Sequence, residues 1–183
     1  MSNILVGIVA VLLFIALAVA GAYYLGPRFQ EAQSGGKALL LTQMTSQVSA
    51  ACSMYRAEAS VPVVARTPAI YLQTQGFLKA IPLNPMIEQG GWPFRVLYSG
   101  DLLTSGFYAD MVFVSLGSGQ DARKLCESVN RQTHQSAEVP QLPLEAGSNV
   151  SSVLSGNIGC FRMHDVGIPG EANPGDYIVY SKL

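Results

Sequence analysis

An uncharged, mostly apolar stretch at residues 4–26 constrains this chain more than any other feature of its sequence. As an α-helix, its 23 residues would extend roughly 35 Å, enough to cross a hydrocarbon layer of about 30 Å. A cleaved secretory signal is the alternative, since residues 20–22 (AGA) are similar to a cleavage site. Such signals carry a basic first segment and a shorter apolar run, whereas the first charged side chain here is Arg28. The stretch therefore predicts a retained membrane-spanning helix.

A second helical pattern follows the apolar stretch and is amphipathic. Its apolar residues recur at steps of three and four, with polar residues such as Gln43 and Gln47 between them. They are Leu41, Met44, Val48, Ala51 and Tyr55, which we expect to pack a globular domain on the helix. Read as one helix from residue 4 to 57, the pattern would extend roughly 80 Å. The sequence thus predicts a membrane or filament-core half at 1–27, an amphipathic half at 28–57 and a globular head at 58–183.

Two points in this long helix are predicted to be weak. Gly26 and Pro27 are expected to bend or locally melt it, because the proline ring displaces one backbone hydrogen bond. Gly35 and Gly36 are its softest point, since adjacent glycines favour a flexible joint over a stiff rod.

Four segments of the head have the composition of β-strands. They are rich in β-branched and aromatic residues and are bounded by Gly, Pro, Asn or Asp. They lie at residues 94–98, 107–116, 158–164 and 177–181. The predicted fold class is α+β, with the long N-terminal helix, apolar in its first half, packed on a four-stranded antiparallel sheet, and with a disulfide-closed C-terminal region.

Shorter elements connect these strands. Thr67 and Pro68 suit the N-cap and first position of a short helix that ends at Gly76. Residues 76–94 contain three prolines and paired glycines and predict a surface loop. Residues 118–134 predict a helix, and residues 135–155 a further loop. The apolar face of that helix is formed by Ala122, Leu125, Cys126 and Val129.

Three cysteines, Cys52, Cys126 and Cys160, allow one disulfide if the head lies outside the cytoplasm. We predict the pair Cys126–Cys160, because one lies on the late helix and the other on a late strand, whereas Cys52 is far away on the long helix. Closing a loop of about 35 residues would stabilise the head by roughly 4 kcal/mol. Three buried thiols in a reducing compartment are the alternative. Cys52 is expected to pack under the sheet.

The composition gives little support for catalysis or for direct nucleic-acid binding. A net charge of -1, with 13% charged residues, provides no basic surface for a polyanion. His134 and His164 lie in separate segments without metal-ligand spacing, and residues 115–119 lack the lysine of a phosphate loop. We therefore expect no enzyme activity, no metal and no cofactor.

Several segments, taken in their order, resemble the type IV pilins and pseudopilins. They are the apolar helix leading into an amphipathic one, ACSMYRAEAS at 51–60, GFLKAIPLNP at 76–85, the four strands and the late cysteine pair. The helix DARKLCESVN at 121–130 and the segment GNIGCF at 156–161 are most similar to the type IVb subgroup. The resemblance in architecture extends over the whole chain. The resemblance in sequence motif is limited to the segments just quoted.

This resemblance implies a structural subunit made at the bacterial inner membrane and assembled by pilus machinery into a homo-oligomeric helical filament, extracellular or periplasmic. The N-terminal helices would bundle in its core through Ile4, Gly7, Leu12, Phe14, Ala18, Gly21 and Tyr24. An uncharged helix can exchange lipid for like helices at little cost in hydrophobic free energy. The chain departs from the family pattern because no acidic residue precedes Glu31. Leader cleavage and N-terminal methylation are therefore not carried over.

Two other hypotheses stand beside the filament subunit. The first is a single-span, membrane-anchored periplasmic domain that binds a partner or an adhesion target and does not polymerise. The second is a secreted enzyme whose mature chain begins near Ala22. The task of such a filament, whether adhesion, conjugation, DNA uptake or secretion, is not fixed by its fold.

Overall fold

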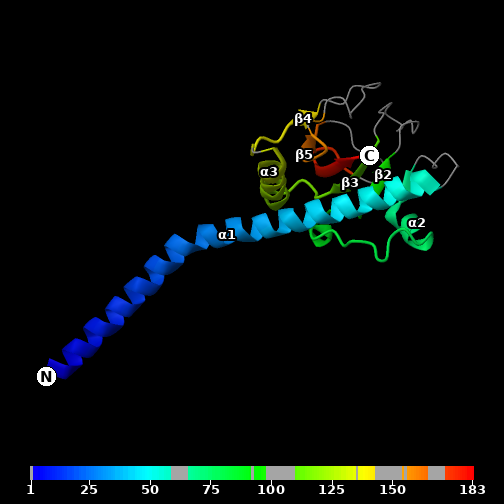
Figure 1. Cartoon of the computed structure of the whole chain (residues 1–183). Helices are drawn as coiled ribbons and strands as arrows, with labels where there is room; N and C mark the ends of the chain where they lie inside the picture. The colour runs from blue at the N-terminus through cyan, green and yellow to red at the C-terminus, as the bar shows by residue number, and fades with distance from the viewer. Residues whose placement is uncertain are drawn as a thin grey trace. The chain divides into compact units, whose positions relative to one another are not determined.

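The chain forms two compact units, Met1–Gly36 and Lys37–Leu183. A computed structural model describes residues 2–58, 66–91, 93–97, 110–134, 136–142, 154, 156–164 and 172–183. Its helices are α1 (Ser2–Glu58), α2 (Ala69–Thr74) and α3 (Gln120–His134), with a 3-10 turn η1 (Ile87–Gln89) (Figure 1). Its strands are β1 (Arg66–Pro68), β2 (Arg95–Leu97), β3 (Met111–Ser115), β4 (Gln141–Leu142), β5 (Ile158–Met163) and β6 (Tyr177–Lys182). The predicted α+β class is confirmed.

Helix α1 contributes residues to both units. It is assigned as α-helix throughout, including at the four residues predicted to weaken it, Gly26, Pro27, Gly35 and Gly36. The boundary between the units falls directly after Gly36. The predicted bending or melting of the helix under load in a filament stays a prediction.

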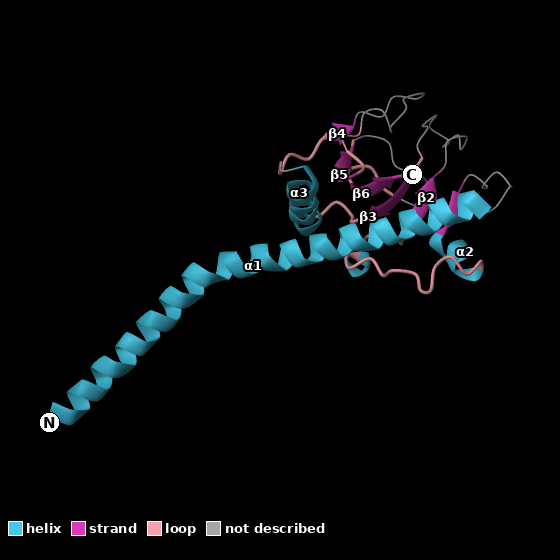
Figure 2. Ribbon diagram, in the orientation of Figure 1, coloured by secondary structure: helices cyan, strands magenta, loops and turns pink. Residues whose placement is uncertain are grey.

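The four predicted strands correspond to β2, β3, β5 and β6, which pair antiparallel in the order β2-β3-β6-β5 (Figure 2). Val179 of β6 lies opposite Val114 on one side and Cys160 on the other. Two short strands extend this sheet to six, with β1 beside β2 and β4 parallel to β5. Tyr98 and residues 107–109, included in the predicted strands, lie outside the described residues.

The amphipathic part of α1 packs on the head as its spacing predicts. Leu41, Val48 and Ala51 are buried in the core, and Met44 and Tyr55 are half-buried against it. Thr45 lies on the same buried face, where its hydroxyl donates to the Leu41 carbonyl oxygen at 2.7 Å. This bond satisfies a polar group that burial would otherwise leave unpaired.

Both faces of the central strands are buried. One face contributes Val112, Val114, Cys160, Tyr177 and Val179 to the core that contains the apolar residues of α1 and α3. Side chains alternate between the faces of a strand, and the intervening residues are also buried. These are Met111, Phe113, Phe161, Met163, Ile178 and Tyr180. The strands therefore read as continuous apolar runs, which is typical of strands covered on both faces.

Two local predictions are wrong. Residues Arg66–Pro68 form β1 and pair with Leu97, Val96 and Arg95 of β2, so the helix begins at Ala69 and not with the N-cap at Thr67. Pro68 is compatible with this role because β1 is an edge strand, where a missing backbone donor is tolerated. Within the predicted loop at 135–155, Gln141–Leu142 form β4 and pair with Arg162 and Met163.

The loop after α2 follows the prediction and is held by Asn84. Gly76 ends α2 with a φ of 84°, a conformation that favours glycine. The buried Asn84 amide donates to the Ser115 carbonyl oxygen at 2.7 Å, and its Oδ1 accepts from the Met86 backbone N–H at 3.0 Å. A Cβ at Gly91 would lie 2.6 Å from Asn84 Nδ2, so a glycine is needed there. The loop is thereby fixed to the end of β3.

Adjacent leucines of α1 provide a matched test of this packing. Leu41 has no exposed surface, whereas Leu40 is 43% exposed. We expect Leu41→Ala to lower the free energy of unfolding of the head by about 2–5 kcal/mol, because it removes a buried side chain and leaves a cavity. Leu40→Ala should lower it by less than about 1 kcal/mol. Denaturant unfolding of the full chain in detergent measures both, and equal losses would contradict the proposed packing.

Candidate functional site: the exposed apolar helix

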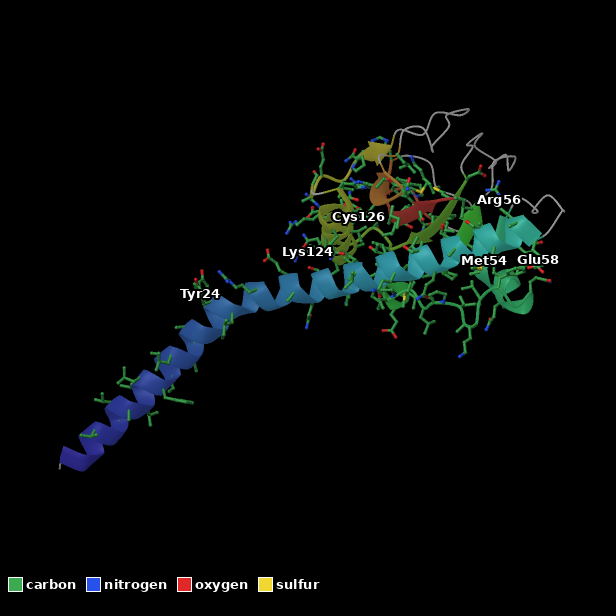
Figure 3. All side chains as sticks on the ribbon, viewed as in Figure 1. Tyr24, Met54, Arg56, Glu58, Lys124 and Cys126 are labelled. Atoms are coloured by element: carbon green, nitrogen blue, oxygen red, sulfur yellow. A yellow bond between two sulfur atoms is a disulfide. The ribbon has the colours of Figure 1, made fainter. Side chains whose placement is uncertain are left out.

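The first unit presents an apolar surface on all sides of α1. From Val6 to Leu25 the described side chains are exposed, apart from the half-buried Gly21. Phe14 and Leu17 have 74% and 71% of their surface exposed. Figure 3 shows side chains projecting to both sides of this part of the ribbon. Nothing in the described part of the chain covers it.

The free-energy cost of leaving this surface in water is large. Eleven large aliphatic or phenyl side chains of the described segment Val6–Leu25 are exposed by about half or more. With about 1.5–3 kcal/mol for each side chain at full exposure, scaled by the exposed fraction of each, their exposure to water costs on the order of 10–20 kcal/mol. Surroundings of low polarity would remove this cost.

The residues predicted to pack a filament core lie on this surface. Gly7, Leu12, Phe14, Ala18 and Tyr24 are exposed, and Gly21 is half-buried. The side chain of Ile4 is outside the described set. Because the structure contains one chain, packing between copies stays a prediction.

Glycines of α1 leave open notches in the apolar surface. A Cβ built at Gly7, Gly21 or Gly26 would meet no other atom within 4 Å. No close approach inside the chain therefore requires glycine at these positions. Small residues at such positions let the backbones of neighbouring membrane helices approach closely.

The predicted disulfide is confirmed and closes the head. Cys126 of α3 and Cys160 of β5 are bonded, with 34 residues of sequence separation. Both are buried in the core. Cys52 is buried in the same core and takes no part in this disulfide, as expected.

Asn130 supports this disulfide and was not singled out by the sequence. Its side-chain Oδ1 accepts from the Cys160 backbone N–H at 2.6 Å, and its Nδ2 donates to the Cys160 carbonyl oxygen at 2.8 Å. The same Nδ2 donates to the Glu138 carbonyl oxygen, also at 2.8 Å. The Asn130 amide thus makes the two backbone hydrogen bonds that a neighbouring strand would make with Cys160. Two residues further along β5, at Arg162, the pairing with β4 begins.

His134 lies at the end of α3, beside a cavity of about 310 Å³ that Asn130, Glu138 and Cys160 also line. A Cβ at Gly156 or Gly159 would lie within about 2.5 Å of its ring, so both glycines are needed for this close approach. Its Nε2 is buried and has no hydrogen-bond partner among the residues that the structure describes. His164 follows β5, and no group of three or more His, Cys, Asp or Glu residues suited to a metal ion occurs among the residues described.

An aromatic cluster joins the end of the amphipathic helix to α2. The Tyr55 ring makes edge contacts with the rings of Tyr71 and Phe77, at centroid distances of 5.7 and 5.4 Å. The Tyr55 hydroxyl donates to the Tyr71 hydroxyl at 3.4 Å, and this bond raises the pKa of Tyr55 above its ordinary value.

On α3, the ion pair with Glu127 at 2.7 Å raises the pKa of Arg123.

Helix α1 is long and apolar enough to cross a membrane, and an N-terminal signal sequence would have the same two properties.

Comparison with protein-family models, with curated proteins and with solved structures finds no match to this chain.

Replacing Asn130 tests its role at the sheet edge. We expect Asn130→Leu to lower the free energy of unfolding by about 3 kcal/mol or more, since it leaves the Cys160 backbone groups and the Glu138 carbonyl oxygen without this partner. The exposed neighbour Arg131 is the control, and Arg131→Leu should change stability by about 0.5 kcal/mol or less. Denaturant unfolding of the oxidised proteins compares them; a loss below 1 kcal/mol for Asn130→Leu would contradict the role.

The disulfide is tested separately by Cys160→Ser, which preserves the backbone groups that bind Asn130. The expected loss is roughly 4 kcal/mol, because the cross-link restricts the unfolded chain. Thermal unfolding under oxidising and reducing conditions measures it. A wild-type melting temperature for the variant in oxidising buffer would show that the bond adds no stability.

Proposed function

We propose that this protein is a structural subunit of a type IV filament, similar in plan to the type IVb pilins, and that copies assemble through the first half of α1. The observation that carries the proposal is the apolar surface at Val6–Leu25, which the described chain leaves uncovered. Before assembly the cover is lipid. After assembly it is the same segment of neighbouring copies.

The exchange between these two surroundings is energetically feasible. Lipid tails and apolar side chains are similarly hydrophobic, so moving an uncharged helix between them changes little hydrophobic free energy. Helix packing and contacts between heads must then determine assembly. The open notches at Gly7 and Gly21 support close packing, because a neighbouring helix can enter them without displacing atoms of this chain.

The head has the properties required of a domain carried outside the cytoplasm. Its Cys126–Cys160 disulfide is of the kind that oxidising compartments form and maintain. Its core draws on α3, on the sheet and on the part of α1 from Ala38 onward, and all of these core residues lie within the second unit. A change in the surroundings of residues 6–25 therefore requires no repacking of that core.

The second candidate is a single-span, membrane-anchored periplasmic domain that does not polymerise. It is favoured by the same helix, whose length and composition already satisfy a plain anchor. The two candidates differ in the importance of the notches. An anchor surrounded by lipid tolerates larger apolar residues there, whereas a helix bundle does not.

Filling the notches separates these functions. Gly7 and Gly21 are 14 residues apart, about four helical turns, and therefore lie on the same side of α1. We expect the double variant Gly7→Leu/Gly21→Leu to reach the membrane and fold normally but to abolish filaments or reduce them strongly. The control is Val19→Leu, a similar apolar change at a position that is already large and exposed. Negative-stain electron microscopy of sheared cells, with membrane fractionation, provides the readout.

The outcomes distinguish the candidates. Loss of filaments only in the glycine variant supports packing through these notches. Unchanged filaments in that variant contradict this packing. Wild-type cells that hold all of the protein in the inner membrane, with no filament in the sheared fraction, would favour the anchored domain.

A further inference from the structure

The end of the apolar surface is marked by two tyrosines and one arginine. Tyr23 and Tyr24 are 86% and 70% exposed, and the Arg28 guanidinium carbon lies 5.6 Å from the centroid of the Tyr24 ring. Arg28 has no carboxylate partner in the described part of the chain. It is also the first charged residue, and the next is Glu31. The change from apolar to charged surface therefore occurs within about one helical turn.

These features match the boundary between lipid and water. Tyrosine rings are enriched at this level of a membrane, because an apolar ring and a polar hydroxyl each find a suitable environment there. An arginine over an aromatic face gains a cation–π interaction while its N–H donors remain free for other acceptors. A phosphate supplies two oxygens in the geometry that a guanidinium binds best.

The length of the helix agrees with this assignment. Twenty residues of α-helix span about 30 Å, the thickness of the hydrocarbon layer. With Tyr24 at one boundary, the other boundary falls near Ile4, next to the polar residues Ser2 and Asn3. Polar residues then lie at both headgroup levels, and every residue between the boundaries is uncharged.

We infer that Tyr24 and Arg28 form a contact site for phospholipid headgroups, with the guanidinium on a lipid phosphate and the ring at the carbonyl level of the lipid, and that this pair sets the depth of α1 in the bilayer. The inference rests on the membrane-inserted stage of the proposed function and not on filament formation. It applies equally to an anchored, non-polymerising protein. Its failure is therefore distinguishable from a failure of the filament proposal.

Depth measurements on the full chain in vesicles test this site. Trp92 is the single tryptophan, so Trp92→Phe with Ala22→Trp places one fluorescent reporter near the boundary. The vesicles contain phosphatidylcholine, alone or mixed with phosphatidylglycerol, and quenching by lipids brominated at different acyl positions reports the depth. Both lipids carry a phosphodiester, so the site should operate in both mixtures.

Removing the charge should let the helix sink. In Arg28→Gln the first remaining charge is Glu31, three residues further, so we expect the reporter to move deeper by up to about 4.5 Å. Tyr24→Leu should move it in the same direction. Because the two side chains act as one contact, the double variant should move it little further than Arg28→Gln alone. Arg28→Lys keeps the charge and should restore part of the depth.

The matched control is Lys37→Gln, which removes one positive charge from the same helix nine residues further on, and it should leave the depth unchanged. Flotation of the vesicles should recover all variants equally, since the apolar segment drives insertion. Three results would overturn the inference: an unchanged depth in Arg28→Gln and Tyr24→Leu, an equal shift in Lys37→Gln, or failure of Arg28→Gln to float with the vesicles.

Discussion

The proposed function depends on an apolar helical surface whose exposure to water is costly. The side chains of residues 6–25 point outward on all sides of α1, and their exposure to water would cost on the order of 10–20 kcal/mol. Unfolding the head would not relieve this cost, because residues 6–25 lie outside its core. Only apolar surroundings for the helix itself can remove it. A lipid bilayer suits such an uncharged surface, and in the proposed function a bundle of identical helices is the second surrounding that does.

The head is built so that its integrity does not depend on which of these surroundings is present. Its core takes the buried residues of α1 from Ala38 onward, while the apolar surface belongs to the other unit. Cys126–Cys160 joins α3 to β5, and Asn130 binds the backbone of the same cysteine. Asn84 holds the loop after α2 to the end of β3. One helix can thus serve two environments at its two ends.

The sequence predicted the features that produce a periodic or compositional signal. The buried face of α1 follows from the spacing of Leu41, Val48 and Ala51, and the four main strands follow from runs of β-branched and aromatic residues. The disulfide was predictable because only one pairing joined two nearby late elements. Each of these signals is local or involves few alternatives.

The remaining features depend on partners far away in the sequence. Residues 66–68 contain a good helix start, but pairing with β2 makes them an edge strand. The two residues of β4 are too few to show alternation, and only β5 determines their conformation. Asn130 is one polar residue on an amphipathic helix, and its role depends on Cys160, 30 residues later. The contact between Tyr24 and Arg28 has a simple signal, an aromatic residue four positions before a cation, but its meaning depends on the apolar surface that it ends.

The central claim is that the apolar helix is retained in the working protein and covered first by lipid and then by other copies. The most direct test is the intact mass of the protein in filaments sheared from the cell surface. The account predicts a mass that includes the whole apolar segment, with residues 6–25 present. A chain in that fraction that begins near Ala22 or later would contradict it.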